Sequence, residues 1–263
     1  MKQLTLIFIL SLIMLSCQNR SKNTSTPITT KTEIEVVSQP VVNMHLEDTL
    51  SITKNFVLGK FNYKVDSTFV KVDLKHATKE IFINTMAYKA FLRMADSAKK
   101  EGIDLKILSG TRNYYEQKTI WERKWKKYNN LNPIDRSKKI LEYSSMPSTS
   151  RHHWGTDIDL NSLNNSYFNT GKGLSVYKWL KSNANRFGFY QVYTNKKTNG
   201  RTGYNEEKWH WSYLPLASKY LEYYNSNIEA KDISGFEGSE LADKLNVIKE
   251  YANGISIKAK DYK

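Results

Sequence analysis

The chain has 263 residues, of which 40% are hydrophobic and 13% aromatic, enough to bury the core of one ordinary domain and to exclude a chain that is disordered throughout. Its single cysteine excludes internal disulfides and cysteine-rich zinc sites, so a tight metal site must use His, Asp or Glu. The formal charge of +14 comes from scattered lysines, which favours a solvated basic surface over a nucleic-acid recognition patch.

The N-terminal segment is typical of an exported protein. Lys2 precedes an apolar run from Leu4 to Leu15. That run is shorter than the ~20 apolar residues that a membrane-spanning helix needs, so we predict a signal peptide over residues 1–16. Because Cys17 follows directly, the segment resembles a bacterial lipoprotein signal. The resemblance implies that Cys17 is lipidated and anchors the protein to a membrane.

Residues 17–45 are rich in Ser, Thr, Asn and Lys and lack glycine, which predicts an extended linker behind the anchor. The globular signals that follow place a folded domain at residues 46–225 and a helical tail at 226–263. An exported protein meets lipid headgroups and cell-wall polymers before nucleic acid, so we expect no nucleic-acid partner.

The first half of the folded domain predicts a helix, then a strand, then a second helix. Residues 86–102 carry an apolar stripe at helical spacing and end at Gly102, a candidate C-cap. Residues 103–108 alternate as a strand does. The segment 109–117 then leads into a further helix that contains two tryptophans.

The second half mixes helices and strands without a regular βαβ alternation. The predicted elements are strands at 156–160, 189–193 and 208–214 and helices at 176–187 and 239–254. Ser239 is the candidate cap of the last helix. With no glycine-rich phosphate loop either, this order predicts an α+β fold with a small, mostly antiparallel sheet flanked by helices.

The stretch SRHHWGTDIDL (150–160) holds the first group of candidate ligands. After Gly155, apolar side chains alternate with Asp157 and Asp159, which places both aspartates on one polar strand face. His152 lies an odd number of residues from Asp159, so the two can converge only if the chain turns at Gly155. A polar turn with structural histidines is the alternative.

A second group lies in YNEEKWHWSY (204–213), where His210 stands between Trp209 and Trp211 on a predicted strand. Strand alternation turns both tryptophans to the core and His210 to the open face. A histidine held this rigidly suits a metal site, although it can equally be a strand-packing residue.

Together, His152, Asp159 and His210 offer two imidazole nitrogens and one carboxylate. Catalytic zinc sites use three such ligands and leave a fourth position for water. A carboxylate that does not bind the metal is then needed as general base. Glu206 and Glu207 both precede His210, and spacing alone does not choose between them.

The third group is SGTRNYYEQ (109–117), in which Arg112 follows a predicted strand end. Functional side chains gather on such loops. A buried guanidinium there could bind a substrate carboxylate or a developing oxyanion. A surface arginine of a basic protein is the alternative.

In chain order, these groups resemble the zinc D-alanyl-D-alanine carboxypeptidases of the VanY kind, members of the LAS metallopeptidases that are related to lysostaphin-type and hedgehog domains. The family pattern is Ser-x-His-x-x-Gly-x-x-x-Asp followed by Glu-x-Trp-His, preceded by Ser-Gly-x-Arg with a glutamine five residues after the arginine. The matching positions here are Ser109, Gly110, Arg112, Gln117, Ser150, His152, Gly155, Asp159, Glu207, Trp209 and His210. The resemblance covers roughly residues 80–215.

The resemblance implies a role for each matching residue. It makes His152, Asp159 and His210 the ligands of Zn²⁺, Glu207 the catalytic base in preference to Glu206, and Arg112 the cation that binds a carboxylate or oxyanion. Gln117 and Ser150 become candidates for substrate contact. The chain departs from the pattern at His153, Trp154 and Asp157, where Asp157 could support the metal ligands from behind and His153 is an alternative ligand.

The resemblance also implies a hedgehog/DD-peptidase-like fold and an exported, membrane-tethered peptidase that trims peptidoglycan stem peptides. An L,D-carboxypeptidase or a peptidoglycan endopeptidase would use the same residues. Outside the enzymes, the alternative is a non-catalytic cell-wall-binding lipoprotein. Retention of the candidate base Glu207 favours the enzyme.

Overall fold

The computed structural model describes residues 52–263, which belong to one compact unit. The predicted signal peptide, Cys17 and the linker at 17–45 lie outside the described residues. Within the described part of the chain, no helix combines the length and the apolar composition that crossing a membrane would require.

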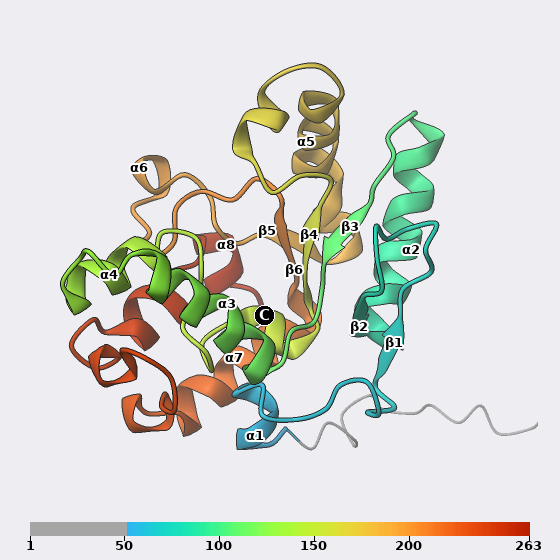
Figure 1. The fold of residues 1–263 in the computed structure, drawn as a ribbon. Helices are drawn as coiled ribbons and strands as arrows, with labels where there is room; N and C mark the ends of the chain where they lie inside the picture. Colours follow the sequence, from blue (N-terminus) through green and yellow to red (C-terminus); the bar gives the residue numbers. More distant parts are fainter. Residues whose placement is uncertain (1–51) are drawn as a thin grey trace, which may run out of the picture. The chain divides into compact units, whose positions relative to one another are not determined.

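A four-stranded antiparallel sheet organises the fold (Figure 1). Its strands lie in the order β3-β4-β6-β5, where β3 is Ile107–Ser109, β4 Asp157–Leu160, β5 Phe189–Gln191 and β6 His210–Tyr213. A separate pair joins β1 (Phe69–Lys71) to β2 (Phe82–Asn84). Strands far apart in sequence are therefore neighbours, and β4 and β6 form the centre of the larger sheet.

Helices surround these sheets and supply about half of the buried core residues. The α-helices are α1 Lys54–Val57, α2 Thr85–Lys100, α3 Tyr114–Lys127, α4 Pro133–Ile140, α5 Gly171–Asn183, α6 Lys196–Asn199, α7 Leu214–Asn227 and α8 Ile257–Lys260. The 3₁₀-helices are η1 Arg151–Trp154, η2 Asn165–Asn169, η3 Ala184–Phe187, η4 Ala230–Asp232 and η5 Ser239–Leu241, and η6 Ile248–Ala252 is a π-helix. Helix α2 packs on both β1 and β2, and α7 follows β6 directly and packs on α1. This confirms the predicted α+β class.

Local signals explain where the longer helices begin and end. The side chain of Asn84 accepts a hydrogen bond from the Met86 amide at the start of α2, and Gly102 (φ +74°) follows the helix end, as predicted for a C-cap. Helix α3 begins with a capping box in which Asn113 and Glu116 satisfy each other's free amides.

The strands are shorter than predicted because pairing, not alternation, sets their length. In the segment predicted as a strand at 103–108, Leu105 and Ile107 are buried as expected, but β3 begins only at Ile107, which pairs with Leu160 at the end of β4. The segment before it hydrogen-bonds to the Asn161 side chain instead.

The predicted continuous helix at 239–254 is wrong. Ser239 makes no capping hydrogen bond, and Asn246 adopts a positive φ of 48°, which interrupts any α-helix. Beyond it the chain forms the π-helix η6, in which the Glu250 carbonyl accepts a hydrogen bond from the Thr202 hydroxyl. The segment is thus divided into two short helices, η5 and η6, and the second contacts a distant loop.

Candidate metal centre and active-site pocket

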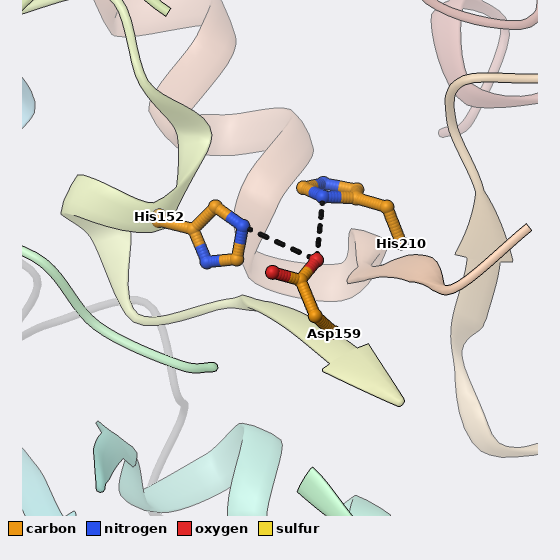
Figure 2. A group of neighbouring side chains, drawn as sticks. All are labelled: His152, Asp159 and His210. Atoms are coloured by element: carbon orange, nitrogen blue, oxygen red, sulfur yellow. Dashed lines mark hydrogen bonds and ion pairs between the residues drawn. The ribbon is translucent and has the colours of Figure 1, made fainter. Parts of the chain in front are cut away.

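The turn at η1 brings His152 to Asp159. η1 ends at Gly155, whose φ of +69° reverses the chain into β4. His152 Nε2 consequently lies 3.5 Å from Asp159 Oδ1 (Figure 2). This is the turn that the spacing of the two residues requires.

The register of the central strands brings His210 to the same point. Asp159 on β4 is directly opposite His210 on β6. His210 Nδ1 lies 3.1 Å from Asp159 Oδ1, on the side where His152 also approaches (Figure 2). Two distant segments thus place two imidazoles around one carboxylate oxygen.

Hydrogen bonds at the far side of each ring decide which nitrogen faces Asp159. His152 Nδ1 lies 2.8 Å from the Gly110 carbonyl, which can only accept, so Nδ1 carries the proton and Nε2 has its lone pair free. His210 Nε2 lies 2.9 Å from Asp157 Oδ2, which leaves Nδ1 as the nitrogen toward the centre. Both rings are therefore oriented as ligating histidines are.

The three groups fit a tetrahedral zinc ion. Their ligand atoms all lie within 4.8 Å of one another, and the three residues are buried. Ligands at the usual zinc distances are about 3.3 Å apart. The two distances to Asp159 Oδ1, 3.1 and 3.5 Å, bracket that value. Two nitrogens and one carboxylate oxygen are also a donor set that zinc accepts.

Burial and neighbouring charges shift the pKa of each ligand residue at the centre. Burial opposes the His210 imidazolium, but hydrogen bonds to Asp157 and Asp159 outweigh it and raise the pKa of His210 to about 9. Burial likewise disfavours the Asp159 carboxylate, yet the neighbouring histidines lower its pKa well below the usual range. Burial and the nearby Arg112 lower the pKa of His152. The carboxylate is thus an anion ready to hold a cation.

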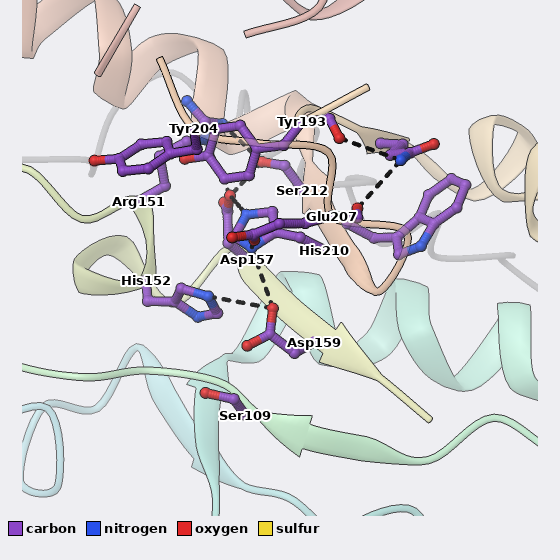
Figure 3. A network of polar contacts seen from close by, with 12 residues as sticks. Ser109, Arg151, His152, Asp157, Asp159, Tyr193, Tyr204, Glu207, His210 and Ser212 are labelled. Carbon is purple, nitrogen blue, oxygen red and sulfur yellow. Dashed lines mark hydrogen bonds and ion pairs between the residues drawn. The ribbon is translucent and has the colours of Figure 1, made fainter. Parts of the chain in front are cut away.

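Asp157 supports His210 from behind and is itself held by a buried arginine. Arg151 Nε donates to Asp157 Oδ2 at 2.9 Å, and another Arg151 nitrogen donates to Ser212 Oγ at 2.7 Å (Figure 3). Burial disfavours the Asp157 carboxylate, but Arg151 lowers its pKa. Arg151 was not among the site residues predicted from the sequence. Its position next to the candidate ligand His152 was the available signal.

Glu207 lies beside the centre without joining the ligand group. Its Oε2 is 3.6 Å from His210 Nδ1. The Glu207 amide donates to the Tyr193 carbonyl, and the Glu207 carbonyl accepts from Gln191, so the backbone is fixed at this point. Burial, with a contribution from Asp159, raises the pKa of Glu207 to about 8. Glu206, in contrast, does not line the cavity.

Arg112 reaches the same cavity from the loop after β3. It is partly buried, and its guanidinium donates to Gln117 Oε1 and to Ser109 Oγ. Gln117 in turn donates to the Ser145 carbonyl. Gln117 was predicted to contact substrate. In the structure its side chain contacts Arg112 and orients the guanidinium.

Ser150 and His153 occupy different environments. Ser150 is buried and lines the cavity, and its hydroxyl has no hydrogen-bond partner among residues 52–263. Both ring nitrogens of His153 already have hydrogen-bond partners: Nδ1 lies 2.6 Å from the Arg112 carbonyl, and Nε2 accepts a hydrogen bond from the Ser148 amide. His153 is absent from the ligand group found in the described residues, so the structure does not place this alternative ligand at the centre.

One cavity of about 600 Å³ is lined by the ligand residues and by the candidate base and substrate contacts. Arg112, Gln117 and Ser150 line it together with the three ligand residues and Glu207. The Tyr193 ring lies 4.6 Å from the His210 ring, on the side where Figure 3 also shows Tyr204. A peptide end could thus reach the metal centre, a carboxylate and a cation at once.

A family model of the VanY D-alanyl-D-alanine carboxypeptidases matches residues 80–216, the stretch that carries every residue of the site. The chain belongs to the VanY family. The membership confirms the resemblance that the spaced motifs indicated.

Sequence relatives of this VanY-family chain include YodJ of Bacillus subtilis, 30% identical over 151 residues. The alignment covers 55% of this chain and 51% of YodJ, so the chain spans about half the length of that relative. An uncharacterised protein of Haemophilus influenzae is 30% identical over 95 residues, which cover 31% of this chain and 70% of that protein.

Solved structures similar to this chain include the LdcB LD-carboxypeptidase, with 26% identity, a TM-score of 0.49 and coverage of 65% of this chain and 81% of LdcB. A vancomycin-resistance D,D-pentapeptidase VanY, crystallised with Zn(II), has 23% identity and a TM-score of 0.45, with coverage of 60% and 86%. The family assignment rests on the sequence match.

Proposed function

We propose that this chain is a zinc-dependent D-alanyl-D-alanine carboxypeptidase that removes the terminal D-alanine of peptidoglycan stem peptides. The observation that carries the proposal is the convergence of three ligand atoms with Glu207 beside them, inside a cavity that Arg112 also reaches. Membership of the VanY family supports the same reaction class.

In this proposal His152, Asp159 and His210 hold zinc. When bound, zinc supplies Lewis acidity that polarises a carbonyl and lowers the pKa of water. Glu207 accepts the proton of the attacking water and then donates it to the leaving amine of D-alanine. Its buried position suits both steps, because a carboxyl group with a raised pKa can take up and release a proton near neutral pH.

Arg112 binds the terminal carboxylate of the peptide or the oxyanion that forms at the scissile carbonyl. Gln117 and Ser109 hold its guanidinium in place, so little side-chain freedom is lost when the substrate binds. Ser150 also lines the cavity, and because its hydroxyl has no hydrogen-bond partner among residues 52–263, it is a further candidate for substrate contact.

The test is incubation of the purified full-length protein with a stem pentapeptide, with and without a chelator, followed by mass spectrometry. We expect release of one D-alanine that stops when the metal is removed. Glu207→Gln should retain zinc by metal analysis and lower kcat by about 10²–10⁴-fold, the usual contribution of a general base. Glu206→Gln is the matched control, because that neighbouring carboxylate does not line the cavity.

Unchanged hydrolysis by Glu207→Gln would remove Glu207 from the mechanism. Cleavage of a tetrapeptide in preference to the pentapeptide would replace the D,D assignment with an L,D one. Equal cleavage of a peptide amidated at its C-terminus would indicate an endopeptidase, which needs no terminal carboxylate. Bound zinc without hydrolysis of any peptide would favour the non-catalytic cell-wall-binding protein.

We also propose that the protein acts in the cell envelope, anchored through a lipid on Cys17. The apolar run from Leu4 to Leu15 and the cysteine directly behind the signal support this. Replacing Cys17 with alanine should move the protein from the membrane fraction to the soluble fraction. An unchanged distribution would contradict the anchor.

A further inference from the structure

Cations that the proposed mechanism does not use also line the cavity: Lys79 and Arg123 are exposed, and Lys124 is partly buried. Lys124, on the face of α3 that lines the cavity, is partly buried, and its Nζ donates to the buried Ser144 hydroxyl. No carboxylate lies within ion-pair distance of Lys124 in the part of the chain that the structure describes.

The surroundings of Lys124 disfavour its charge. Burial lowers the pKa of Lys124, and the neighbouring cations Arg123 and Arg112 lower it further, while Glu207 partly offsets them. A partly desolvated ammonium among like charges gains free energy when an anion binds next to it. Arg123, exposed at the cavity wall, adds to the positive potential there.

The spacing of Gln117 and Lys124 along α3 suits a peptide. Gln117, which orients Arg112, and Lys124 are seven residues apart on α3, which is two helical turns, or about 10 Å along one helix face. An extended peptide advances about 3.5 Å per residue. A carboxylate about three residues' length from the peptide terminus can therefore reach Lys124 while the terminal carboxylate contacts Arg112.

We propose that Lys124, together with Ser144, forms a second anion subsite that binds a further carboxylate of the peptide, upstream of the scissile bond. The inference rests on the proposed carboxypeptidase function. Stem peptides offer such a group as the α-carboxylate of a γ-linked glutamyl residue or as the side-chain carboxylate of a diaminopimelyl residue. The subsite would make the enzyme selective for peptides in which that group is not amidated.

Four pentapeptides test the proposal, with the glutamyl and the diaminopimelyl carboxylates each free or amidated. The zinc-loaded full-length protein is compared with Lys124→Met, Lys124→Arg and Lys126→Met by kcat/KM. Lys126 is the matched control, since it is an exposed lysine of the same helix that does not line the cavity. Circular dichroism of each variant shows whether the fold is retained.

We expect the wild type to prefer one free carboxylate over its amide by about tenfold, the scale of one charge-assisted hydrogen bond. Whichever of the glutamyl and diaminopimelyl carboxylates shows this preference is the group that binds at the subsite. In Lys124→Met, the ratio of kcat/KM for the free peptide to that for the amidated peptide should fall close to one. Lys124→Arg should retain most of the wild-type preference, and Lys126→Met should retain all of it.

Equal kcat/KM for all four peptides in the wild type would overturn the subsite. A fall by the same factor for every peptide in Lys124→Met would overturn it too, because Lys124 would then act on the reaction itself. If no peptide is hydrolysed, the carboxypeptidase function fails instead. Dissociation constants of the four peptides for the Glu207→Gln variant still decide the subsite in that case, through the same ratios.

Discussion

At the scale of single residues, the hydrogen-bond partners of the ligand histidines decide which ring nitrogen is free to bind the metal. The Gly110 carbonyl and Asp157 each occupy one nitrogen of a histidine and so present the other nitrogen to Asp159. Arg151 keeps Asp157 ionised in a place where burial alone would favour the neutral acid. The departure from the family pattern at Asp157 thus has a physical role in orienting His210.

Zinc affinity should rise with pH because of His210. The pKa of His210 is raised to about 9 in the protein without metal, so Nδ1 must lose a proton before it can bind zinc. We expect the apparent affinity to increase about tenfold per pH unit between pH 7 and pH 9 and to level off above. Competition with a chromophoric chelator at each pH measures this.

The same protonation affects the stability of the zinc-free protein. A raised pKa means that the folded state binds the proton more tightly than the unfolded state, whose histidine has a pKa near 6.5. The stabilisation of the folded state by this proton is complete below pH 6.5 and is lost as the pH rises through about 9. A zinc affinity that did not change with pH would contradict the assignment of His210 as a ligand with this pKa.

At the scale of elements, the site depends on one turn and one strand register. η1 and Gly155 return the chain so that His152 lies over β4, and the pairing of β4 with β6 aligns Asp159 with His210. The Gly155 carbonyl also accepts a hydrogen bond from the Asn84 amide, which ties the turn to the end of β2. The Asp159–His210 pairing and the Asn84–Gly155 hydrogen bond both join segments that are far apart in the sequence.

Gly155→Ala should therefore disable the metal centre. Its φ of +69° disfavours alanine, and the added Cβ would lie 2.3 Å from the Phe69 ring and 2.9 Å from the Asn84 amide nitrogen. We expect a loss of about 2–4 kcal/mol in the free energy of unfolding and weaker zinc binding. Urea denaturation and zinc titration measure the two effects.

Gly102→Ala separates backbone strain from crowding. Gly102 has a similar φ of +74°, but no atom lies within 4 Å of the added Cβ. The Gly102→Ala variant should lose only about 1–2 kcal/mol in the free energy of unfolding and keep the zinc affinity of the wild type. Equal effects of the two substitutions on zinc binding would show that the turn at Gly155 does not position His152.

At the scale of the whole molecule, the C-terminal segment is part of the folded unit. Phe236 packs edge-on against Trp121 of α3 with ring centroids 5.8 Å apart, and Trp121 Nε1 donates to the Glu237 carbonyl. Arg201 donates to the Gly254 carbonyl and to other carbonyls of the loop before β6. The tail thus supports both the helix that carries Lys124 and the loop that leads to Glu207.

Removal of residues 234–263 should destabilise the whole peptidase. Truncation exposes Trp121 and removes Phe236, each of which contributes about 1.5–3 kcal/mol through burial. We expect the thermal midpoint to fall by about 10 °C or more. Removal of only residues 261–263 is the control. An unchanged midpoint in the longer truncation would show that the tail packs without stabilising the fold.

The sequence by itself determined the chemistry available to this protein. Alternation in residues 156–160 placed Asp157 and Asp159 on one strand face, and the spacing across Gly155 required the turn that the structure contains. The fold class and the helices α2, α3 and α5 also followed from local periodicity and capping, whereas α7 was not predicted. These features depend on residues close together in the chain, where the side-chain pattern and backbone preferences act directly.

The tertiary structure alone decided how those groups are used. It selected the ligating nitrogen of each histidine, paired Arg151 with Asp157, set the short strand lengths and interrupted the tail helix at Asn246. Except for Arg151 and Asp157, which are six residues apart, these features depend on partners tens of residues away, such as Asp157 and His210. Local pattern carries no information about such pairs, because their free energy arises only when packing removes water and brings the segments together.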